Sequence, residues 1–390
     1  MASTLRGAKR GRRWILRSVP IAVLGIFAYL YHVIGYEYYV RHVLATHPWP
    51  QHLRTWCFVL FLHLMFFYCV SLHIQITMAR PKYVDTISYT QTWSPMPRHQ
   101  YWLPLYPLRI LTAKPRDEDS ADLQHMIHER AASGEPQRCW RDRCRGHWKA
   151  PRMRHCGECG ECRFFFDHHC LWFNNDITAP HTLVPFLLLI SLTPCLFVLA
   201  CWPLLPLAWH HIVLLWEHST SHPWIVQHFW DKKWTWVLGP IHRPLLGLYL
   251  ASRYPPSSWG QRSLFDTTAP QPTFRLPFCI MLGAFLALIT LGLAITTIRH
   301  LIHGQLTVEA ERTRSWKKWN QPGSLVSMEK KESVRPAYQF WVPHKQCIIY
   351  HPTDEALFNR GWLTNLSGYM GISTANPFAW PHSLVQDLIS

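Results

Sequence analysis

Charged side chains are scarce in this sequence, and acidic ones are the scarcer kind. Asp and Glu number 23 against 39 Lys and Arg, and all four together make up 16% of the 390 residues, whereas soluble globular chains carry roughly 25%. Apolar and aromatic residues are abundant instead, at 48% and 14%, and aromatic rings concentrate at membrane interfaces. No internal repeat is visible. With 30 prolines, this composition excludes a coiled coil and intrinsic disorder alike.

Four stretches are apolar enough to cross a bilayer, which takes about 20 residues of helix. They cover residues 19–40, 56–76, 183–209 and 276–298, and the last two contain no charged residue. His32 and Glu37 interrupt the first stretch. A basic start followed by an apolar run is also typical of a signal peptide, but this run is long and no small-residue cleavage pattern follows it. We therefore expect a retained helix.

The distribution of Lys and Arg predicts how the chain is oriented. Six lie before the first apolar stretch, 15 lie in residues 77–182 and ten lie from Arg299 onward, whereas the loop between the first two helices holds only Arg41 and Arg54. Because positive charge collects on the cytoplasmic side, both termini and the central segment are expected there. The predicted fold is an all-α integral membrane protein with a basic arm (1–18), helices one and two (19–77), a cytosolic segment (78–182), helices three and four (183–298) and a cytosolic tail (299–390).

The basic excess and the loop between helices three and four indicate what surrounds the chain. The basic excess is explained by topology and by attraction to anionic lipid, and no stacking platform or groove-reading motif accompanies it, so no nucleic-acid partner is expected. The loop between helices three and four is long and rich in Trp and His. Within it, residues 237–251 are apolar but broken by Gly, Pro and Arg243, which favours an interfacial or re-entrant piece. The lipid bilayer is the expected surrounding.

Six of the twelve cysteines fall between Cys139 and Cys170. Cysteines clustered in a reducing cytosolic segment point to metal binding or catalysis rather than to disulfides. Cys156, Cys159 and Cys162 follow one another at three-residue steps, with Gly157 and Gly160 between them to permit tight bends. Tetrahedral zinc takes two ligands from each such knuckle. The region about 138–182 therefore predicts a small zinc-stapled domain between helices two and three.

This segment resembles the cysteine-rich domain of the DHHC-type protein S-acyltransferases (palmitoyltransferases). The resemblance lies in Lys149-Ala-Pro-Arg152-Met-Arg-His155-Cys156, in the two C-x-x-C steps that follow, and in Asp167-His168-His169-Cys170-Leu171-Trp172-Phe173-Asn174-Asn175-Asp176. Weaker similarities follow. Leu306-Thr307-Val308-Glu309 is similar to the family's T-T-x-E motif, and the tail from Asn365 to Gly371 resembles its C-terminal motif of aromatic, Asn and Gly residues.

The resemblance implies two structural zinc ions with interleaved ligands. The first would be held by Cys139, Cys144, His155 and Cys162, and the second by Cys156, Cys159, His169 and Asp176. Asp176 stands where the family has its last Cys, and a carboxylate is an acceptable though harder zinc ligand. The chain departs from the family in four more places. The gap between Cys139 and Cys144 is four residues instead of two, and Arg80-Pro81-Lys82 stands where a D-P-G signature is usual. Leu171 replaces the usual Pro, and His181 stands roughly where the family has a structural Asn.

The resemblance also implies a reaction, which the residue types can support. A free Cys has a pKa of about 8.5, so Cys170 as nucleophile benefits from a neighbouring base, for which His168 is the candidate. Asp167 would orient that imidazole and stabilise its charged form. An acyl chain would pass from acyl-CoA, the co-substrate, to Cys170 and then to a membrane-proximal cysteine of a protein substrate. Lys149, Arg152, Arg154 and Arg163 are nearby cations that CoA phosphates would favour, although each has an alternative interpretation as a solvated or lipid-facing charge.

Family members of this kind are multi-pass proteins of endomembranes, in the endoplasmic reticulum or Golgi, and the same placement is expected here. The alternative to an acyltransferase is a catalytically weak membrane scaffold that keeps the zinc fold. Asp176 and the stretched Cys139–Cys144 pair favour that alternative, and the intact Asp167-His168-His169-Cys170 run argues against it.

Overall fold

The computed structural model describes residues 18–47, 49, 52–79, 128–129, 138–144, 146–149, 152–163, 165–179, 181–256, 272–319, 338–342, 347–351, 359 and 361–369. The basic arm before Ser18, the stretch at 80–82 and the tail beyond Tyr369, Gly371 included, lie outside these residues.

Four helices are long and apolar enough to cross a membrane, and all four correspond to predicted stretches. They span Ser18–Val43, Leu53–Met78 (α3), Leu183–Ser221 and Arg275–Ile302 (α11). The second half of the first helix, η1 (Tyr31–Val43), is wound as a π-helix and continues into α2 (Leu44–Thr46). The four-helix prediction is thus confirmed, with helices that extend past the predicted ends.

The third helical run is longer than expected, and a break divides it into two helices. Its 39 residues would measure about 58 Å if straight, at 1.5 Å per residue, against an apolar bilayer thickness of about 30 Å. A 3₁₀ turn over Trp202–Leu204 (η3) separates α6 (Leu183–Cys201) from α7 (Leu205–Ser221). Pro203 and Pro206 explain the break, since proline removes backbone donors and favours the first positions of a new helix.

The chain divides into two units. One comprises Leu24–Cys69 and Leu192–Leu291, and its core joins parts of all four long helices through the buried residues Val33, Ile34, Tyr38, Tyr39, Val59, Leu62, Cys201, Leu204, Ala208, Leu276 and Cys279. The Tyr39 hydroxyl donates a 2.6 Å hydrogen bond to the Ala200 carbonyl. Packing within this unit therefore fixes the apolar helices against one another.

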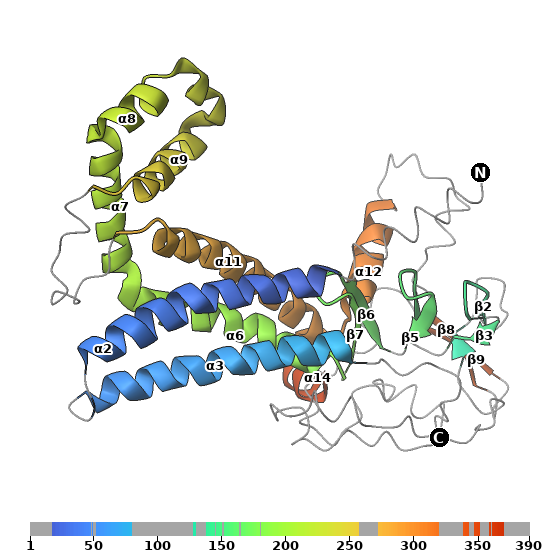
Figure 1. The fold of residues 1–390 in the computed structure, drawn as a ribbon. Coiled ribbons are helices and arrows are strands. Elements are labelled where there is room, and N and C mark those ends of the chain that lie inside the picture. Colours follow the sequence, from blue (N-terminus) through green and yellow to red (C-terminus); the bar gives the residue numbers. More distant parts are fainter. Residues whose placement is uncertain are drawn as a thin grey trace. The chain divides into compact units, whose positions relative to one another are not determined.

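Beyond η3, the same unit forms a helical hairpin. Its elements are α7, α8 (Pro223–Ile225), η4 (Val226–Trp230), η5 (Lys233–Leu238) and α9 (Gly239–Arg253). α9 packs back along α7 (Figure 1) around Leu215, Ile225, Phe229, Leu248 and Ala251. The Arg243 guanidinium lies 4.8 Å from the Trp230 ring and 4.1 Å from the Trp236 ring. The piece expected over 237–251 is thus a packed helix, and its depth in the membrane stays a prediction.

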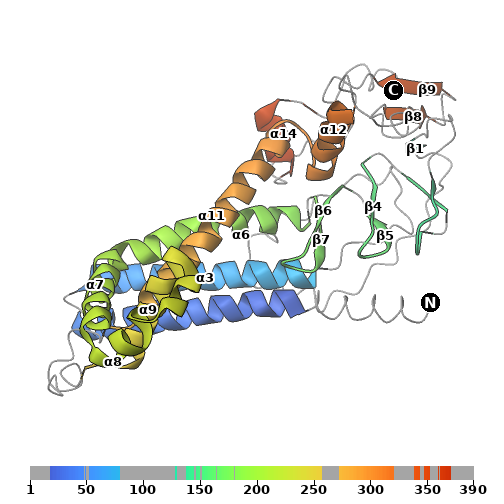
Figure 2. The same ribbon diagram turned by 90° about the horizontal axis from the view of Figure 1, so that it is seen from above.

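The other unit comprises Met1–Val23, Val70–Ser191 and Gly292–Ser390 and contains the cysteine-rich segment. Three antiparallel hairpins lie in a row, with β6–β7 nearest the end of α3 and the start of α6 that belong to this unit, β4–β5 in the middle and β2–β3 outermost (Figures 1 and 2). Their strands are Arg138–Cys139 (β2), His147–Trp148 (β3), Arg154–Cys156 (β4), Glu161–Arg163 (β5), Phe166–Cys170 (β6) and Asn175–Thr178 (β7). The chain is mostly helical, as predicted, but the expectation of an all-α fold missed these short strands.

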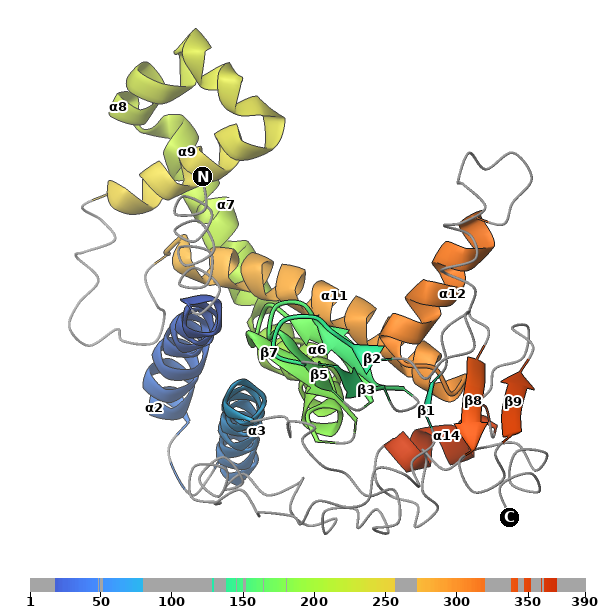
Figure 3. The same ribbon diagram turned by 90° about the vertical axis from the view of Figure 1, so that its right-hand side faces the viewer.

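The region after α11 completes this unit. α11 leads into α12 (Thr307–Trp319; Figure 3), and α12 packs on β6. Two strands after α12, β8 (Tyr338–Val342) and β9 (Cys347–His351), form a three-stranded antiparallel sheet with the earlier strand β1 (His128–Glu129), in the order β1, β8, β9. The last helix is α14 (Trp362–Tyr369).

Candidate active site and metal centre

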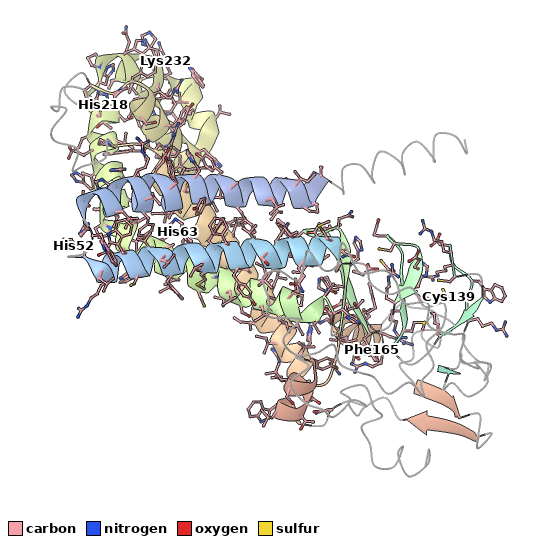
Figure 4. All side chains as sticks on the ribbon, turned by 60° about the horizontal axis from the view of Figure 1, so that its bottom comes forward. His52, His63, Cys139, Phe165, His218 and Lys232 are labelled. Carbon is pink, nitrogen blue, oxygen red and sulfur yellow. The ribbon has the colours of Figure 1, made fainter. Side chains whose placement is uncertain are left out.

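The first cluster is built from the two outer hairpins. Cys139 on β2 and Cys144 in the following turn lie with their Sγ atoms 3.5 and 3.4 Å from His155 Nδ1, and Cys162 Sγ lies 3.9 Å from it. The β4–β5 register pairs His155 with Cys162 across the ladder. In Figure 4, Cys139 lies in the outermost hairpin, apart from Phe165 at the start of the β6–β7 hairpin.

The second cluster joins the middle hairpin to the β6–β7 hairpin. His169 Nδ1 lies 3.6 Å from both Cys156 Sγ and Cys159 Sγ and 2.8 Å from Asp176 Oδ1. The turn between the two cysteines has a backbone N–H of Cys159 directed at Cys156 Sγ, at 3.4 Å. His169 and Asp176 face each other because they are direct partners in the β6–β7 ladder.

The donor sets fit tetrahedral zinc. Zn–S bonds near 2.3 Å and Zn–N bonds near 2.0–2.1 Å give a sulfur-to-nitrogen edge of about 3.6 Å in a tetrahedron. The five sulfur-to-nitrogen distances of the two clusters run from 3.4 to 3.9 Å, and within each cluster all four ligand atoms lie within 4.8 Å of one another. Both clusters could therefore hold a metal ion, and each contains the four residues that the sequence grouped together. Metal binding by the individual residues stays a prediction.

Outer contacts hold the ligands in place. Asp142 Oδ2 lies 3.1 Å from His155 Nε2, the kind of second contact that fixes the ring of a ligating His. Burial opposes ionisation of Asp176, but hydrogen bonds from His169, Cys156, Cys159 and Arg163 outweigh it and lower the pKa of this carboxyl to about 2. Asp176 is thus a carboxylate at neutral pH, as a metal ligand must be.

The alternation of β6 separates the two roles of the Asp-His-His-Cys run. Successive side chains of a strand point to opposite faces, so His168 and Cys170 share one face while His169 points to the other, toward the second cluster. The register of β6–β7 shifts between Phe166 and His168, which places Asp167 in the irregular position. Such irregularities re-aim a side chain, and here Asp167 Oδ2 reaches His168 Nδ1 at 2.7 Å.

Asp167 and His168 form a hydrogen-bonded pair, and Cys170 lies on the same face of β6 as His168. Asp167 is buried, and its other oxygen accepts the backbone N–H of Thr307 at 2.7 Å. Burial lowers the pKa of His168, but hydrogen bonds to Asp167 and Cys170 outweigh burial and raise the pKa to about 9. At neutral pH the imidazole is therefore protonated and lies within hydrogen-bond reach of the sulfur of Cys170.

The β6–β7 hairpin is attached to the ends of two long helices. The Asn175 amide donates hydrogen bonds of 2.7 Å to the carbonyls of Ile76 and Ala79 at the end of α3. Thr182, just before α6, donates to the Asp176 carbonyl and accepts the Thr178 N–H. Phe186 of α6 lies edge-on to His168, with ring centres 5.3 Å apart. Cys170 is thus held where α3 ends and α6 begins.

Arg152 is the residue whose role the sequence reasoning missed. It is 1% exposed and has a φ of 61°. Its Nε and Nη2 donate hydrogen bonds of 2.8 and 2.6 Å to the two carboxylate oxygens of Glu309, and Nη2 also reaches the Tyr369 hydroxyl at 2.8 Å. Burial lowers the pKa of Arg152, but Glu309 and Tyr369 raise it overall. Arg152 was one of four candidate cations for CoA phosphates, and here its guanidinium is paired with the Glu309 carboxylate and the Tyr369 phenol.

The Arg163 side chain is also paired with carboxylates. Its Nε donates to Asp176 Oδ2 at 3.1 Å, and its Nη2 lies 2.8 Å from Glu161 Oε2. It is likewise not a free phosphate ligand. Of the four cations considered, Lys149 and Arg154 keep partly exposed positions.

The two weaker sequence similarities fall on residues that brace the site. Glu309 accepts the Leu306 N–H at 2.9 Å as well as the Arg152 bonds, and Thr307 contacts Asp167. In the tail, the Asn365 amide donates to the Ile302 carbonyl at 2.9 Å, and the Tyr369 hydroxyl lies 3.1 Å from the Gly304 carbonyl. Both motifs could be located from sequence, but their pairing with Arg152 could not.

Comparison with known proteins agrees with this geometry. Residues 135–314 match the family model described as DHHC palmitoyltransferase. The chain is 34% identical over 94 residues to palmitoyltransferase spe-10 of Caenorhabditis elegans (24% of this chain, 22% of that protein). It is 25% identical over 201 residues to palmitoyltransferase ZDHHC2 of Rattus norvegicus (50% and 49%), and 44% identical over 54 residues to palmitoyltransferase ZDHHC5-B of Danio rerio (14% and 8%). The matched part of the chain spans half or less of the length of these relatives. Residues 135–314, somewhat less than half of the chain, are thus similar to the domain of the DHHC palmitoyltransferases.

Proposed function

We propose that this chain is a protein S-acyltransferase that moves a palmitoyl-type chain from acyl-CoA to a protein cysteine through an acyl-Cys170 intermediate. The observation that carries the proposal is the hydrogen-bonded pair of Asp167 and His168 beside Cys170, on a hairpin attached to the ends of α3 and α6. The relatives, which are palmitoyltransferases by name, support the same reaction class. The alternative of a catalytically weak scaffold is not favoured, because this set is complete.

The first step uses the protonated imidazole. The Cys170 thiolate attacks the carbonyl carbon of the acyl-CoA thioester, a new carbon–sulfur bond forms, and the bond to CoA sulfur breaks. The leaving thiolate takes the proton that His168 holds, so that free CoA and a neutral imidazole result. Asp167 keeps Nδ1 occupied and thereby presents the other ring nitrogen for this transfer.

The second step runs the same groups in reverse. Neutral His168 removes the proton from the thiol of the protein substrate, and the resulting thiolate attacks the acyl-Cys170 carbonyl. Cys170 leaves as a thiolate beside the reprotonated imidazole, which restores the starting state. No proton or electron is lost over the cycle. Zinc bound in the two clusters would supply structural support, since four protein ligands leave no open position for chemistry.

The surroundings fit a long acyl chain and a membrane-anchored substrate. Each buried CH₂ contributes about 0.8 kcal/mol, so a palmitoyl chain among the apolar helices gains considerable stabilisation. Protein substrates with cysteines near the membrane would reach Cys170 at the helix ends. We place both termini and the hairpins on the cytosolic side on the distribution of Lys and Arg. The family resemblance favours an endomembrane, of the endoplasmic reticulum or Golgi.

Acyl labelling of the purified chain tests the proposal. A palmitoyl-CoA analogue should label the wild type through a bond that neutral hydroxylamine cleaves, and Cys170→Ser should abolish that label. Cys195→Ser, at an exposed cysteine of α6, is the matched control and should label like the wild type. Hydroxylamine-labile label that persists in Cys170→Ser would contradict the proposal, and so would its absence from wild type that retains its zinc.

A further inference from the structure

Beside the second metal cluster lies a buried cation. The Arg163 side chain on β5 is 9% exposed, and burying a charge costs free energy unless the charge is paired. Arg163 has two carboxylate partners. Nε contacts Asp176 Oδ2 at 3.1 Å, and Nη2 contacts Glu161 Oε2 at 2.8 Å. Glu161 is itself held by Arg143, at 2.8 Å on the other side. The guanidinium is thus fixed in place between the two hairpins.

The two oxygens of Asp176 have different neighbours. Oδ1 lies among the cluster atoms, 2.8 Å from His169 Nδ1, while Oδ2 faces Arg163. The terminal torsion of an Asp side chain has a broad energy minimum, so an unattached carboxylate turns freely. Asp176 is fully buried, and its backbone N–H is held by Asn175 Oδ1 at 2.8 Å. The contact with Arg163 then leaves one oxygen, Oδ1, for the metal side.

The first cluster is built differently. Its donors are three cysteines and one histidine, without a carboxylate. With a divalent ion, three thiolates leave that site with one negative charge. Two thiolates and a carboxylate leave the same charge on the second site, but there the Arg163 cation cancels it and draws electron density from the ligating carboxylate. A harder and less electron-rich donor set binds zinc more weakly than thiolates do.

We propose that Arg163 is a positioning residue that makes Asp176 the fourth ligand of the second metal ion, and that this ion exchanges faster than the ion of the first cluster. The inference rests on metal binding by the two clusters and does not require acyl transfer. Arg163 and Asp176 then act as one unit in place of a single thiolate.

Zinc release from the purified full-length chain tests the pairing of Arg163 with Asp176 without any activity measurement. A zinc-binding dye in excess should withdraw one ion per chain about tenfold faster than the other. Outer contacts of a metal ligand contribute roughly 10- to 100-fold in affinity, so Arg163→Met should reduce the zinc content from two ions toward one. Arg143→Met, which removes the other cation from Glu161 without touching Asp176, should keep two ions and the wild-type release rates.

A double variant provides the decisive comparison. A thiolate needs no guanidinium to orient it, so Arg163→Met combined with Asp176→Cys should restore two ions and slow the release of the second. Arg163→Met alone could lose both ions. In that case, recovery of two ions by the double variant would still support the pairing of Arg163 with Asp176, and failure to recover them would overturn the proposal. Two ions with unchanged release in Arg163→Met, or a single ion in the wild type, would also overturn it. Acyl labelling of the same samples reports separately on the proposed reaction.

Discussion

At the scale of single residues, one short strand carries both the structural and the chemical roles. Because β6 alternates, His169 faces the second cluster while His168 and Cys170 face the other side. Asp167 would point away from His168 in a regular strand. The register shift at this position brings its carboxylate within 2.7 Å of the imidazole. The adjacent residues of this run are therefore not interchangeable.

Asp167→Asn tests the role of that carboxylate. The amide can still accept the Thr307 N–H, but it cannot stabilise the imidazolium, so the pKa of His168 falls and the proton for the leaving thiolate is held less well. Self-acylation by palmitoyl-CoA should slow by roughly 10²- to 10⁴-fold, the usual contribution of acid–base catalysis, and zinc content should be unchanged. Rapid-quench labelling measures the rate.

Asp231→Asn, the same substitution at an exposed residue of the α7–α9 hairpin, is the control and should label at the wild-type rate. An Asp167→Asn rate within twofold of wild type would show that His168 works without its carboxylate.

At the scale of elements, a buried ion pair ties the cysteine-rich segment to the region after α11. Arg152 contacts Glu309 of α12 and Tyr369 of α14, which are 157 and 217 residues away along the chain. Burial raises the pKa of Tyr369 to about 12, although the Arg152 cation opposes this shift, so the phenol stays protonated at neutral pH. The contact of Thr307 with Asp167 connects this brace to the catalytic set.

Removing one partner of this pair should be costly. Arg152→Met leaves the Glu309 carboxylate buried without its cation, which typically costs about 3–5 kcal/mol. The purified variant should lose zinc and aggregate at a clearly lower temperature than wild type. Arg152→Met combined with Glu309→Leu should regain much of the loss, because no charge is then left unpaired.

Arg314→Met is the matched control for this experiment. It breaks the exposed pair with Glu311 on α12, whose side chains are 73% and 63% exposed, and exposed pairs contribute little to stability. Equal thermal stability of Arg152→Met and Arg314→Met would refute the bracing role.

The sequence predicted local features well and distant pairings poorly. The four apolar helices follow from hydrophobic runs, and zinc binding follows from the closely spaced cysteines. The division of the ligands into two clusters came from the family resemblance. Arg152 reads as one more basic residue of a cationic segment, because nothing near it marks a partner more than 150 residues away. The bend at Trp202–Leu204 was likewise not predicted, since hydropathy stays high on both sides of it.

At the scale of the whole molecule, the proposed reaction depends on where the nucleophile is attached. Asn175 fixes the β6–β7 hairpin to the end of α3, and Thr182 fixes it to the start of α6. Cys170 is therefore carried by the ends of helices that can span a membrane, where the acyl chain and the soluble CoA group of the proposed donor would meet. Acceptor cysteines next to a lipid anchor or a membrane helix should be preferred over cysteines in soluble peptides.

A pulse–chase experiment follows the acyl group directly from Cys170 to an acceptor cysteine. The purified chain is labelled briefly with a palmitoyl-CoA analogue, the donor is removed, and a lipid-anchored peptide with one cysteine is added. We expect label to leave Cys170 and to appear on the peptide in equal amount, and we expect neither event in Cys170→Ser. Label that stays on Cys170 while the peptide remains unmodified would contradict acyl transfer through this residue.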